Sequence, residues 1–506
     1  MKFDISEKEF ISLAEEKPVI IQLMAEVKTS CTPLDLYASL DKKCAYLLES
    51  VEKEKRHARF SFVGAQPDAV VTVKDRRVSL DYPERTGLIK FIESSLSKIC
   101  DFDKEGKLIA GFDTMDAIRN AFATTGVKFI GKGFDRQTFL GGAIGYCAYD
   151  MVYDCWLDIP AKKSNTPDAQ FALTTKTVLF DHLTEKTYIV MTPFVFDDAK
   201  DAYRAAQEEA RKLETIIKAA RPILVQQNKP SRITPNIEKS EYEDAVRTAK
   251  KHIIDGDIFQ VVLSRRYEVT TDQTPLELYT ELRRVNPSPY MYLFEFNGTG
   301  IIGASPETLL SVHKRKVIIN PIAGTCPRGK TPAEDEKFAK EMLESDKERA
   351  EHVMLVDLGR NDVRMVSKGG TVKVDDFMSV LKYSHVQHIE STVSGELRDE
   401  CDQFDATRAI FPAGTLSGAP KIRAMEIIHD LEKDARGIYG GGVGYYSWNG
   451  DADFAIVIRT IIKNGRMAMV QAGAGIVADS DPEYEYKETE RKMAAMIKAI
   501  GGANEN

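Results

Sequence analysis

The sequence predicts an α+β fold in which helices and strands are segregated along the chain. Strand patterns come in runs, such as 290–296 followed directly by 299–303, whereas a long helical pattern stands apart at 240–255. The regular strand–helix alternation typical of doubly wound folds is missing. The length of 506 residues allows two to four domains, and a hydrophobic content of 43% with a mean hydropathy of -0.29 fits a globular protein with a large core.

The first part of the chain is expected to end near residue 221. Short strand patterns at 70–73 and 187–191 lead into a long helical pattern at 198–220. A polar stretch follows that is interrupted by prolines, namely Pro222, Pro230 and Pro235. We therefore expect one domain over 1–221, a linker over 222–239 and a second domain over 240–506.

The second part is expected to begin with the helix at 240–255, and its predicted strands are 259–263, 290–296, 299–303 and 317–321. A later helix begins at Ser345, because Ser345 and Glu348 have the spacing of a capping box, and this helix carries Glu351.

A last helix is predicted from 483 to about 500. Asp481 is a good acceptor for the first turn, and Pro482 suits the first helical position. Helical spacing places Glu485, Glu488 and Lys492 on one face of this helix.

Glycines gather in one segment near the C-terminus. Nine of the 33 glycines lie between Gly437 and Gly475, around an apolar strand pattern at 454–458 that runs into Arg459. Alternation would put Ala455, Val457 and Arg459 on one face, where a guanidinium beside apolar groups needs an anion. Two interpretations stay open: a site for a small anion, or a bulged hairpin in which Arg459 pairs with Asp451 or Asp453.

A second glycine-containing stretch echoes this segment. Residues 139–146 resemble 439–446 in miniature, which indicates either a weak internal repeat or two unrelated strands.

Several ionisable residues are candidates for chemistry, and each has a structural alternative. Glu485 and Glu488 could bind a hard cation or complement the helix dipole. Glu351 lies in a charged stretch that is typical of a solvated face. His385 and His388, three residues apart, suggest acid–base work or metal binding, although single histidines are commonly structural. The sequence has neither a phosphate-binding P-loop nor a complete dinucleotide fingerprint.

Charge and composition argue against several classes of function and site. With 77 acidic against 69 basic residues and no basic block, we expect no nucleic-acid surface. No apolar run is long enough to span a bilayer and the N-terminus is acidic, so we expect a cytoplasmic protein without a membrane partner. Seven cysteines without a CxxC pair predict free thiols rather than disulfides or a zinc site.

Five long blocks of sequence resemble component I, the large chorismate-binding subunit, of the anthranilate synthases, a family of chorismate-utilising enzymes. The blocks are 320–325, 351–362, 411–428, 439–460 and 471–481. The resemblance implies antiparallel β-sheets packed together with helices on the outside, and a regulatory N-terminal part associated with a catalytic C-terminal part. It also implies the conversion of chorismate and ammonia to anthranilate and pyruvate, the first step of tryptophan biosynthesis.

The same resemblance implies a set of site residues. A magnesium ion (Mg²⁺) would be held by Glu351 and Glu488, and His388, Thr325 and Glu485 would be catalytic. The residues expected to bind chorismate are Gly324, Thr325, Tyr439, Arg459, Gly473, Ala474 and Gly475.

Regulation and partners are implied as well. Tryptophan, as a feedback inhibitor, would bind Leu48, Glu49, Ser50, Pro289, Tyr290 and Met291, which come from both parts of the chain. We expect no fused glutamine amidotransferase domain, so ammonia is expected from a separate glutaminase subunit (component II) or from solution. The expected assembly is a heterotetramer of two large and two small subunits.

Ala323 distinguishes between relatives with different reactions. Aminodeoxychorismate synthases commonly carry a nucleophilic lysine at this place, and isochorismate synthases use a lysine elsewhere to activate water; alanine favours direct attack by ammonia. The alternatives are those two activities, or a catalytically silent regulator that binds chorismate or tryptophan. Cys326 stands where arginine is frequent, and we expect it to weaken anion binding slightly or to be tolerated beside Arg328.

Overall fold

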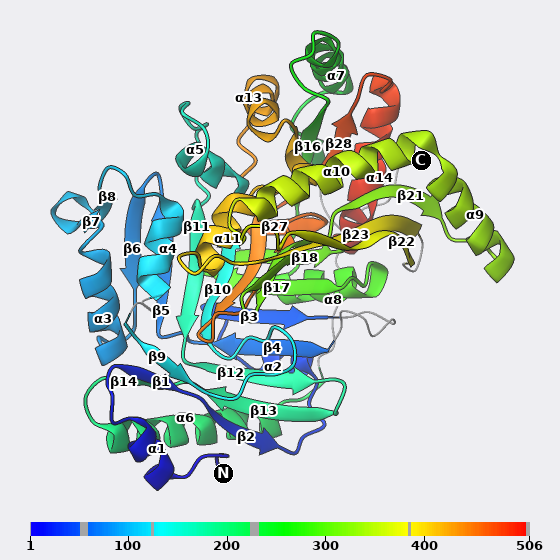
Figure 1. The fold of residues 1–506 in the computed structure, drawn as a ribbon. Coiled ribbons are helices and arrows are strands. Elements are labelled where there is room, and N and C mark those ends of the chain that lie inside the picture. The colour runs from blue at the N-terminus through cyan, green and yellow to red at the C-terminus, as the bar shows by residue number, and fades with distance from the viewer. Residues whose placement is uncertain (1, 51–58, 123–125, 223–231, 383–385, 502–506) are drawn as a thin grey trace.

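Two large antiparallel sheets, packed face to face, form the centre of the molecule (Figure 1). The computed structural model describes residues 2–50, 59–122, 126–222, 232–382 and 386–501. Within that part of the chain, thirteen strands form sheet I and twelve form sheet II.

In spatial order, sheet I contains β21 (Ile322–Pro327), β23 (Val386–Glu396), β20 (Lys316–Ile319), β19 (Thr308–His313), β26 (Ala452–Ile456), β25 (Gly442–Ser447), β10 (Gly142–Cys147), β11 (Ala169–Thr174), β5 (Ala69–Lys74), β6 (Arg77–Asp81), β8 (Lys107–Leu108) and β7 (Cys100–Asp101), with β22 (Lys373–Lys382) beside β23.

Sheet II contains β15 (Arg232–Pro235), β16 (Gln260–Thr270), β28 (Met467–Ile476), β27 (Thr460–Asn464), β18 (Thr299–Ser305), β17 (Tyr290–Phe296), β3 (Cys44–Glu49), β4 (Phe60–Ala65), β12 (Lys176–Asp181), β13 (Lys186–Met191) and β2 (Leu23–Val27), with β24 (Gly418–Ala419) beside β16. A small third sheet joins β14 (Phe194–Val195), β1 (Val19–Ile21) and β9 (Lys128–Ile130).

Strand alternation divides the core into layers. Along β17, Tyr292 and Phe294 point into the core between the two sheets, whereas Met291 and Leu293 point into a second core on the outer face of sheet II. The helices that cover this outer face are α1 (Glu7–Leu13), α2 (Pro33–Ala38), α6 (Ala199–Ala219), α8 (Pro275–Val285) and α14 (Pro482–Ala499).

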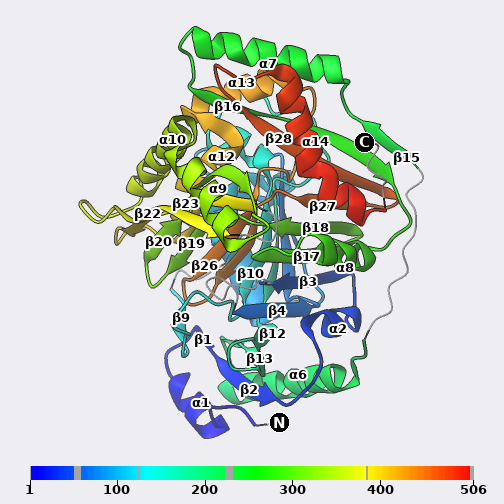
Figure 2. The same ribbon diagram turned by 90° about the vertical axis from the view of Figure 1, so that its right-hand side faces the viewer.

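The outer face of sheet I carries its own helix layer. It includes α3 (Gly87–Leu96), α4 (Thr114–Phe122), α5 (Val152–Cys155), α10 (Asp346–Arg364) and α11 (Gln403–Ile410). The remaining helices are α7 (Lys239–Ile254), α9 (Pro332–Glu344), α12 (Gly414–Ser417) and α13 (Lys421–Leu431), of which α7 and α13 pack against β16 and β28 (Figure 2). The predicted arrangement of packed antiparallel sheets with outer helices is confirmed.

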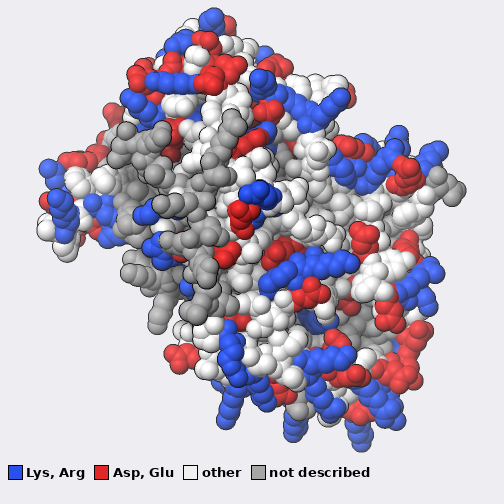
Figure 3. Space-filling view, turned by 180° about the vertical axis from the view of Figure 1, so that it is seen from behind, with Lys and Arg blue, Asp and Glu red and all other residues white. Residues whose placement is uncertain are grey.

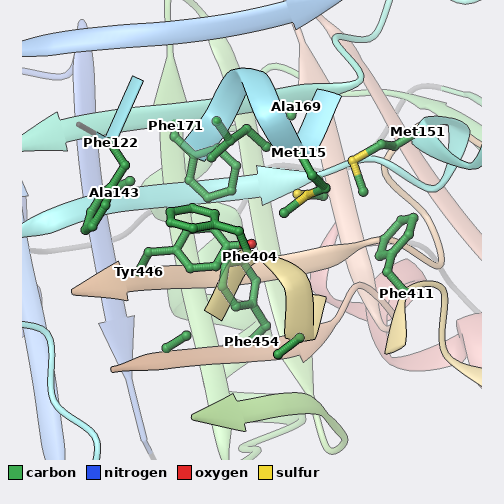
Figure 4. Close-up of a cluster of buried hydrophobic side chains, with 14 of the residues drawn as sticks. Met115, Phe122, Ala143, Met151, Ala169, Phe171, Phe404, Phe411, Tyr446 and Phe454 are labelled. Carbon is green, nitrogen blue, oxygen red and sulfur yellow. The ribbon is translucent and has the colours of Figure 1, made fainter. Parts of the chain in front are cut away.

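Both large sheets take strands from both sides of the expected linker. In sheet I, β10 pairs with β25, and in sheet II, β3 pairs with β17. The aromatic core on sheet I joins the same two parts of the chain, because Phe122 of α4 and Phe404 of α11 lie 5.5 Å apart between ring centroids (Figure 4). The expected linker itself contains β15, and its residues 223–231 lie outside the described part. The division into two domains stays a prediction.

The two stretches that resemble each other in sequence turn out to be neighbours. They form β10 and β25, which pair antiparallel with Gly145 opposite Gly444. A Cβ on either glycine would come within about 2 Å of a carbonyl oxygen of the next strand, so close strand approach explains both glycines. The pairing does not bear on a common origin.

The strand predicted at 454–458 ends two residues earlier than expected. β26 stops at Ile456, and Arg459 has a positive φ of 50°, so the backbone turns before the arginine. Ala455 and Val457 face the core between the sheets, whereas Arg459 does not share that face. The alternation breaks because the chain leaves sheet I here and enters sheet II at β27.

All seven cysteines lie in the described part of the chain and are free thiols, as expected. No helix among the described residues is long and apolar enough to cross a membrane. On the face shown in Figure 3, basic and acidic side chains are interspersed.

Candidate active site

A cavity of about 350 Å³ lies where the edges of the two sheets meet helices α10 and α14. Strands β21 and β23 bring in one wall, β28 brings in another, and the two helices supply charged side chains. Nearly all residues predicted for chorismate, metal and catalysis line this cavity: Gly324, Thr325, Glu351, His388, Tyr439, Arg459, Gly473, Gly475, Glu485 and Glu488.

A β-bulge assembles the first group of polar atoms. Between β21 and β23 the register shifts from Ala323 opposite Ile389 to Cys326 opposite Gln387, which leaves Gly324 and Thr325 bulged beside His388. Gly324 has a φ of 65°, a conformation that glycine adopts without strain. The bulge brings the Gly324 carbonyl oxygen to 2.8 Å and the Thr325 hydroxyl to 3.1 Å from Nδ1 of His388.

His388 is therefore held as a neutral imidazole. Burial lowers its pKa to about 4, and the positive charges of Arg459 and Lys492 contribute in the same direction. Because the Gly324 carbonyl can only accept a hydrogen bond, Nδ1 must carry the proton, and Nε2 is left with a lone pair. At neutral pH this side chain can accept a proton but has none to donate from Nε2.

Helices α10 and α14 both place carboxylates in the lining of the cavity. Ser345 caps α10 by accepting a hydrogen bond from the Glu348 N–H, which is half of the predicted capping box; the Glu348 carboxylate lines the cavity and makes no return bond to Ser345. Burial, and then the carboxylates of Glu351 and Glu488, raise the pKa of Glu348. The two helices thus face each other closely enough for their acids to repel.

The helix predicted near the C-terminus is confirmed. Asp481 caps α14 by accepting from the Tyr484 N–H at 2.9 Å, and Pro482 is its first residue. Lys492 donates to the Gly473 carbonyl at 2.9 Å and pairs with Glu488 at 2.7 Å, which fixes this helix against β28.

The metal prediction rests on few ligands. Among the residues that the structure describes, no group of three or more His, Cys, Asp and Glu side chains is arranged to hold a metal ion. Glu351 and Glu488 do line the same cavity, and Gln260 donates to Glu351 at 3.3 Å. Mg²⁺ commonly takes one or two protein carboxylates and completes its shell with water and substrate oxygens, so two mutually repelling acidic walls fit such an ion.

Strand β28 presents backbone rather than side chains to the cavity. Gly473 and Gly475 line it, and a Cβ on Gly473 would lie 2.9 Å from the Tyr439 hydroxyl and from the Leu263 carbonyl oxygen. The side chain of Ala474 is fully buried on the other face of the strand, among residues of α7 and α13. Ala474 can therefore reach a ligand only through its backbone.

Glu307 is a cavity residue that the sequence did not single out. It follows β18 in the turn before β19, where it is buried and accepts a hydrogen bond from the Thr415 hydroxyl at 2.9 Å. Burial raises its pKa to about 7, against the opposing effects of Thr415, Lys492 and Arg459. The sequence signal for Glu307 was a strand that ends in small residues, followed by Pro306 and a single carboxyl. Turns of this kind are common, so the signal was not specific.

Not every residue that the sequence singled out near the bulge lines the cavity. Ala323 lines the cavity and offers no nucleophile there. Cys326 is not among the residues that line it, although its neighbour Thr325 is, and its effect on anion binding stays a prediction. Arg328 is bound by Asp335, with an Nη2 to Oδ2 distance of 2.7 Å, and also lies outside the lining. His385, the other predicted histidine, lies outside the described residues.

A second, smaller cavity of about 70 Å³ lies between the sheets where β3 and β17 pair. All six residues predicted to bind tryptophan line it: Leu48, Glu49, Ser50, Pro289, Tyr290 and Met291. The carboxylate of Glu49 is bound by Tyr279 at 2.6 Å and Arg283 at 3.0 Å on α8, so the cavity receives the backbone of this residue.

The second cavity is linked to the first by hydrogen bonds. The Tyr290 hydroxyl donates to Asp453 at 3.0 Å and lies 2.9 Å from the hydroxyl of Thr308. Thr308 directly follows Glu307, whose carbonyl accepts from the Ile456 N–H at 3.0 Å. Asp453 accepts hydrogen bonds from Tyr290 and Gln137, and Asp451 lies 3.0 Å from Nδ1 of His313.

Comparison with known proteins agrees with this geometry. The sequence pattern of the chorismate binding enzyme family matches residues 44–498. Anthranilate synthase component 1 2 of Haloarcula marismortui is 47% identical over 534 aligned residues, which cover 99% of this chain and 96% of that protein. Anthranilate synthase component 1 of Acetivibrio thermocellus is 42% identical, with 96% of each chain covered.

Solved structures give the same result for the fold. Anthranilate synthase component I from Streptococcus pneumoniae TIGR4 superposes with a TM-score of 0.70 at 34% identity, covering 88% of this chain and 94% of that one. The menaquinone-specific isochorismate synthase of Escherichia coli also reaches 0.70, covering 97% of each chain, but at 18% identity it shows the shared fold alone.

Proposed function

This chain belongs to the chorismate-binding enzyme family, among the anthranilate synthase component 1 proteins, and we propose on that premise that its large cavity converts chorismate and ammonia to anthranilate, pyruvate and water. The observation that carries the proposal is the meeting of His388, Glu307, Arg459 and two acidic helices around one cavity of about 350 Å³. Chorismate has two carboxylates. One guanidinium, the N–H groups of β28 and a cation held by Glu351 and Glu488 are a suitable set for both.

Mg²⁺ would be bound by Glu351 and Glu488 and would supply positive charge that orients a substrate carboxylate. The protein itself would supply positive charge for the other substrate carboxylate through Arg459, which lines the cavity next to Ile458. Tyr439 and Thr325 would position the ring, since both line the same cavity.

The first chemical step forms the bond between ammonia nitrogen and C2, with loss of one proton from that nitrogen, and breaks the bond between C4 and its hydroxyl oxygen. The hydroxyl must gain a proton to leave as water, and Glu307, with a pKa of about 7, is suited to donate it. Glu485 is a second candidate, because burial raises the pKa of its carboxyl too.

The second step removes the C2 proton and breaks the C3–oxygen bond, which makes the ring aromatic and releases the enolate of pyruvate; the enolate takes up one proton to become pyruvate. Neutral His388 is suited to accept a proton through Nε2, because Nδ1 is engaged with Gly324. Ala323 leaves the cavity without a lysine nucleophile, which favours direct attack by ammonia over the aminodeoxychorismate and isochorismate reactions.

Tryptophan is the proposed inhibitor, and the small cavity between β3 and β17 is its proposed site. A bound ligand there would contact Tyr290, whose hydroxyl bonds to Asp453 and Thr308 on sheet I. A ligand changes activity only if it binds two arrangements with different affinity. The hydrogen bonds from Tyr290 toward Glu307 give such a difference a physical route.

The word component in the relatives' names implies a second component. The proposed partner is a glutamine amidotransferase subunit that supplies ammonia, in an assembly of two large and two small subunits. Free ammonia at high pH should replace it.

The decisive experiment incubates the purified chain with chorismate, Mg²⁺ and ammonium at elevated pH and monitors anthranilate fluorescence. Anthranilate and pyruvate should form in equal amounts, and tryptophan should suppress both. The absence of anthranilate at saturating ammonia would refute the proposal, and formation of aminodeoxychorismate or isochorismate instead would identify one of the alternative activities.

A further inference from the structure

A guanidinium and a carboxylate outside the active-site lining hold much of the cavity wall in place. Arg436 lies between α13 and β25, and Glu432 directly follows α13. They form a buried ion pair, in which Nε and Nη2 of Arg436 lie 2.9 Å and 2.6 Å from the two carboxylate oxygens. We propose that Arg436 and Glu432 are positioning residues, which shape the chorismate site through its wall without touching the substrate; this rests on the proposed function.

The ion pair completes an edge of strand β16. One edge of this strand pairs with β28, and the other pairs with β24 at its start and with β15 at its end. Within the described chain, no strand pairs with the part of that edge between β24 and β15. There Arg436 donates to the Val262 carbonyl at 2.6 Å, and Glu432 accepts from the Ser264 N–H at 2.8 Å. The two side chains thus take the place of a neighbouring strand.

The same guanidinium completes the short helix α12. Its Nη1 donates to the Leu416 carbonyl at 2.7 Å. A helix continued by one turn would offer this carbonyl the N–H of residue 420, but Pro420 has none, so Arg436 supplies the missing donor. Thr415, the residue before Leu416, donates to Glu307 at 2.9 Å. The position of α12 therefore also affects the carboxyl that we assign as proton donor.

Two further wall residues contact the ion pair. The guanidinium carbon lies 4.5 Å from the ring centroid of Tyr149 and 5.8 Å from that of Tyr439, and a cation is attracted to an aromatic face. On the carboxylate side, the Ser264 hydroxyl donates to Glu432 at 2.9 Å and accepts from Gln471 at 2.8 Å. Tyr439 and Gln471 both line the cavity.

The wall residues held by this one pair come from four separate segments, namely β16, α12, the turn before β25, and β28; they are Val262, Leu416, Tyr439 and Gln471. Stability alone does not account for such a pair, because the cost of desolvating two buried charges commonly offsets their attraction. A guanidinium carries a rigid fork of donors, so it can fix the directions of several acceptors at once. The pair therefore contributes a fixed arrangement of the wall.

The test changes the pair and keeps the side chains of similar length. Arg436→Lys keeps the charge and loses the fork, and Glu432→Gln keeps the shape and loses the charge. Each should raise the KM for chorismate at least tenfold at saturating ammonia. Each should leave the Mg²⁺ concentration for half-maximal activity within twofold at saturating chorismate, because Glu351 and Glu488 lie on other helices.

Arg408→Lys on α11 is the matched control. Arg408 binds Asp113 through two nitrogens at 2.8 Å and 2.7 Å, and it lies outside the cavity lining. This variant should lower the midpoint of thermal unfolding and leave the KM for chorismate within twofold. A merely structural role of Arg436 would give the same result in Arg436→Lys.

An unchanged KM for chorismate in either variant, with folding verified by circular dichroism, would overturn the proposal. A parallel rise of the Mg²⁺ requirement, or an equal rise of KM in Arg408→Lys, would also overturn it. If neither variant folds, Ser264→Ala decides, since it removes one hydrogen bond to Glu432 and should raise the same KM at least threefold. If the unsubstituted chain makes no anthranilate, the proposed function fails, and chorismate affinity measured by calorimetry in the same variants tests the positioning separately.

Discussion

His388 and Glu307 lie in one cavity, and burial shifts the pKa of each so that its neutral form is favoured. The pKa of His388 falls to about 4 and that of Glu307 rises to about 7. At neutral pH the histidine is thus a proton acceptor, and a large share of the glutamate is a proton donor. Two groups with separated pKa values are what a reaction with one protonated leaving group and one abstracted proton requires.

Glu307→Gln should lower kcat by about 10²- to 10⁴-fold, the usual contribution of a general acid. In the unsubstituted enzyme, kcat/KM at a fixed concentration of un-ionised ammonia should fall as pH rises through about 7, and this decline should vanish in the variant. Glu485→Gln is the matched comparison. If it removes the decline and Glu307→Gln does not, Glu485 is the proton donor.

The raised pKa of Glu307 also makes the free energy of unfolding depend on pH. Glu307 has a folded pKa above its ordinary 4.5, so the folded state binds more protons than the unfolded state between about 4.5 and 7. Relative to Glu307→Gln, the unsubstituted protein should lose stability as pH rises through that window, by up to about 3 kcal/mol. Urea unfolding at pH 5 and pH 8 measures the difference; parallel pH dependences would show that Glu307 does not titrate there.

Ser50→Phe should remove inhibition by tryptophan and leave chorismate turnover largely intact. Ser50 lines the small cavity between β3 and β17 and not the active site, so a phenyl ring there would fill the inhibitor's space. Initial rates with and without tryptophan provide the measurement. Equal tryptophan sensitivity in the variant would reject the assignment of this cavity.

At the scale of secondary-structure elements, two helices divide the acidic residues of the active site. Glu351 is on α10, which packs on sheet I, and Glu488 is on α14, which packs on sheet II. Both helices start where their capping residues predict, at Ser345 and Asp481. The distance between the two carboxylates is therefore set by how the sheets pack, and not by either helix alone.

Glu351→Gln and Glu488→Gln should each raise the Mg²⁺ concentration needed for half-maximal activity by at least tenfold, because each removes one charged oxygen ligand. Glu483→Gln is the control, since Glu483 is an exposed residue of α14 that pairs with Lys487 at 3.0 Å outside the cavity. Titration of activity with Mg²⁺ tests this. An unchanged Mg²⁺ requirement in both variants would exclude the two glutamates as ligands.

For the whole molecule, the shared sheets determine how it folds. In each large sheet a block of strands from before residue 200 pairs with a block from after residue 230, through β10 and β25 in sheet I and through β3 and β17 in sheet II. Figure 4 shows side chains of α4 and α11 in one aromatic core. Ion pairs reinforce this contact, with Arg408 of α11 bound to Asp113 at 2.7 Å. Neither part of the chain can complete a sheet or a core alone.

Separately produced fragments 1–221 and 240–506 should each fail to unfold cooperatively, because each would expose sheet edges and apolar faces that the other part covers. The full chain should unfold in one main transition. Calorimetry and circular dichroism of both fragments, alone and mixed, make the comparison. A fragment with its own sharp transition would support the independent domains that the proline-rich stretch predicted.

The sequence by itself determined the elements and many of the contact residues. Periodicity and caps predicted α6, α7, α10, α14 and β17 to within a residue or two at most ends, because these signals are local. Resemblance in ordered blocks brought together Thr325, Glu351, His388, Arg459 and Glu488, all of which line one cavity.

Only the tertiary structure decided the rest. The protonation of His388, the raised pKa of Glu307 and the turn that separates Arg459 from Val457 each depend on groups distant in sequence. Burial and electrostatic interaction act through space, so a pattern along the chain cannot specify them.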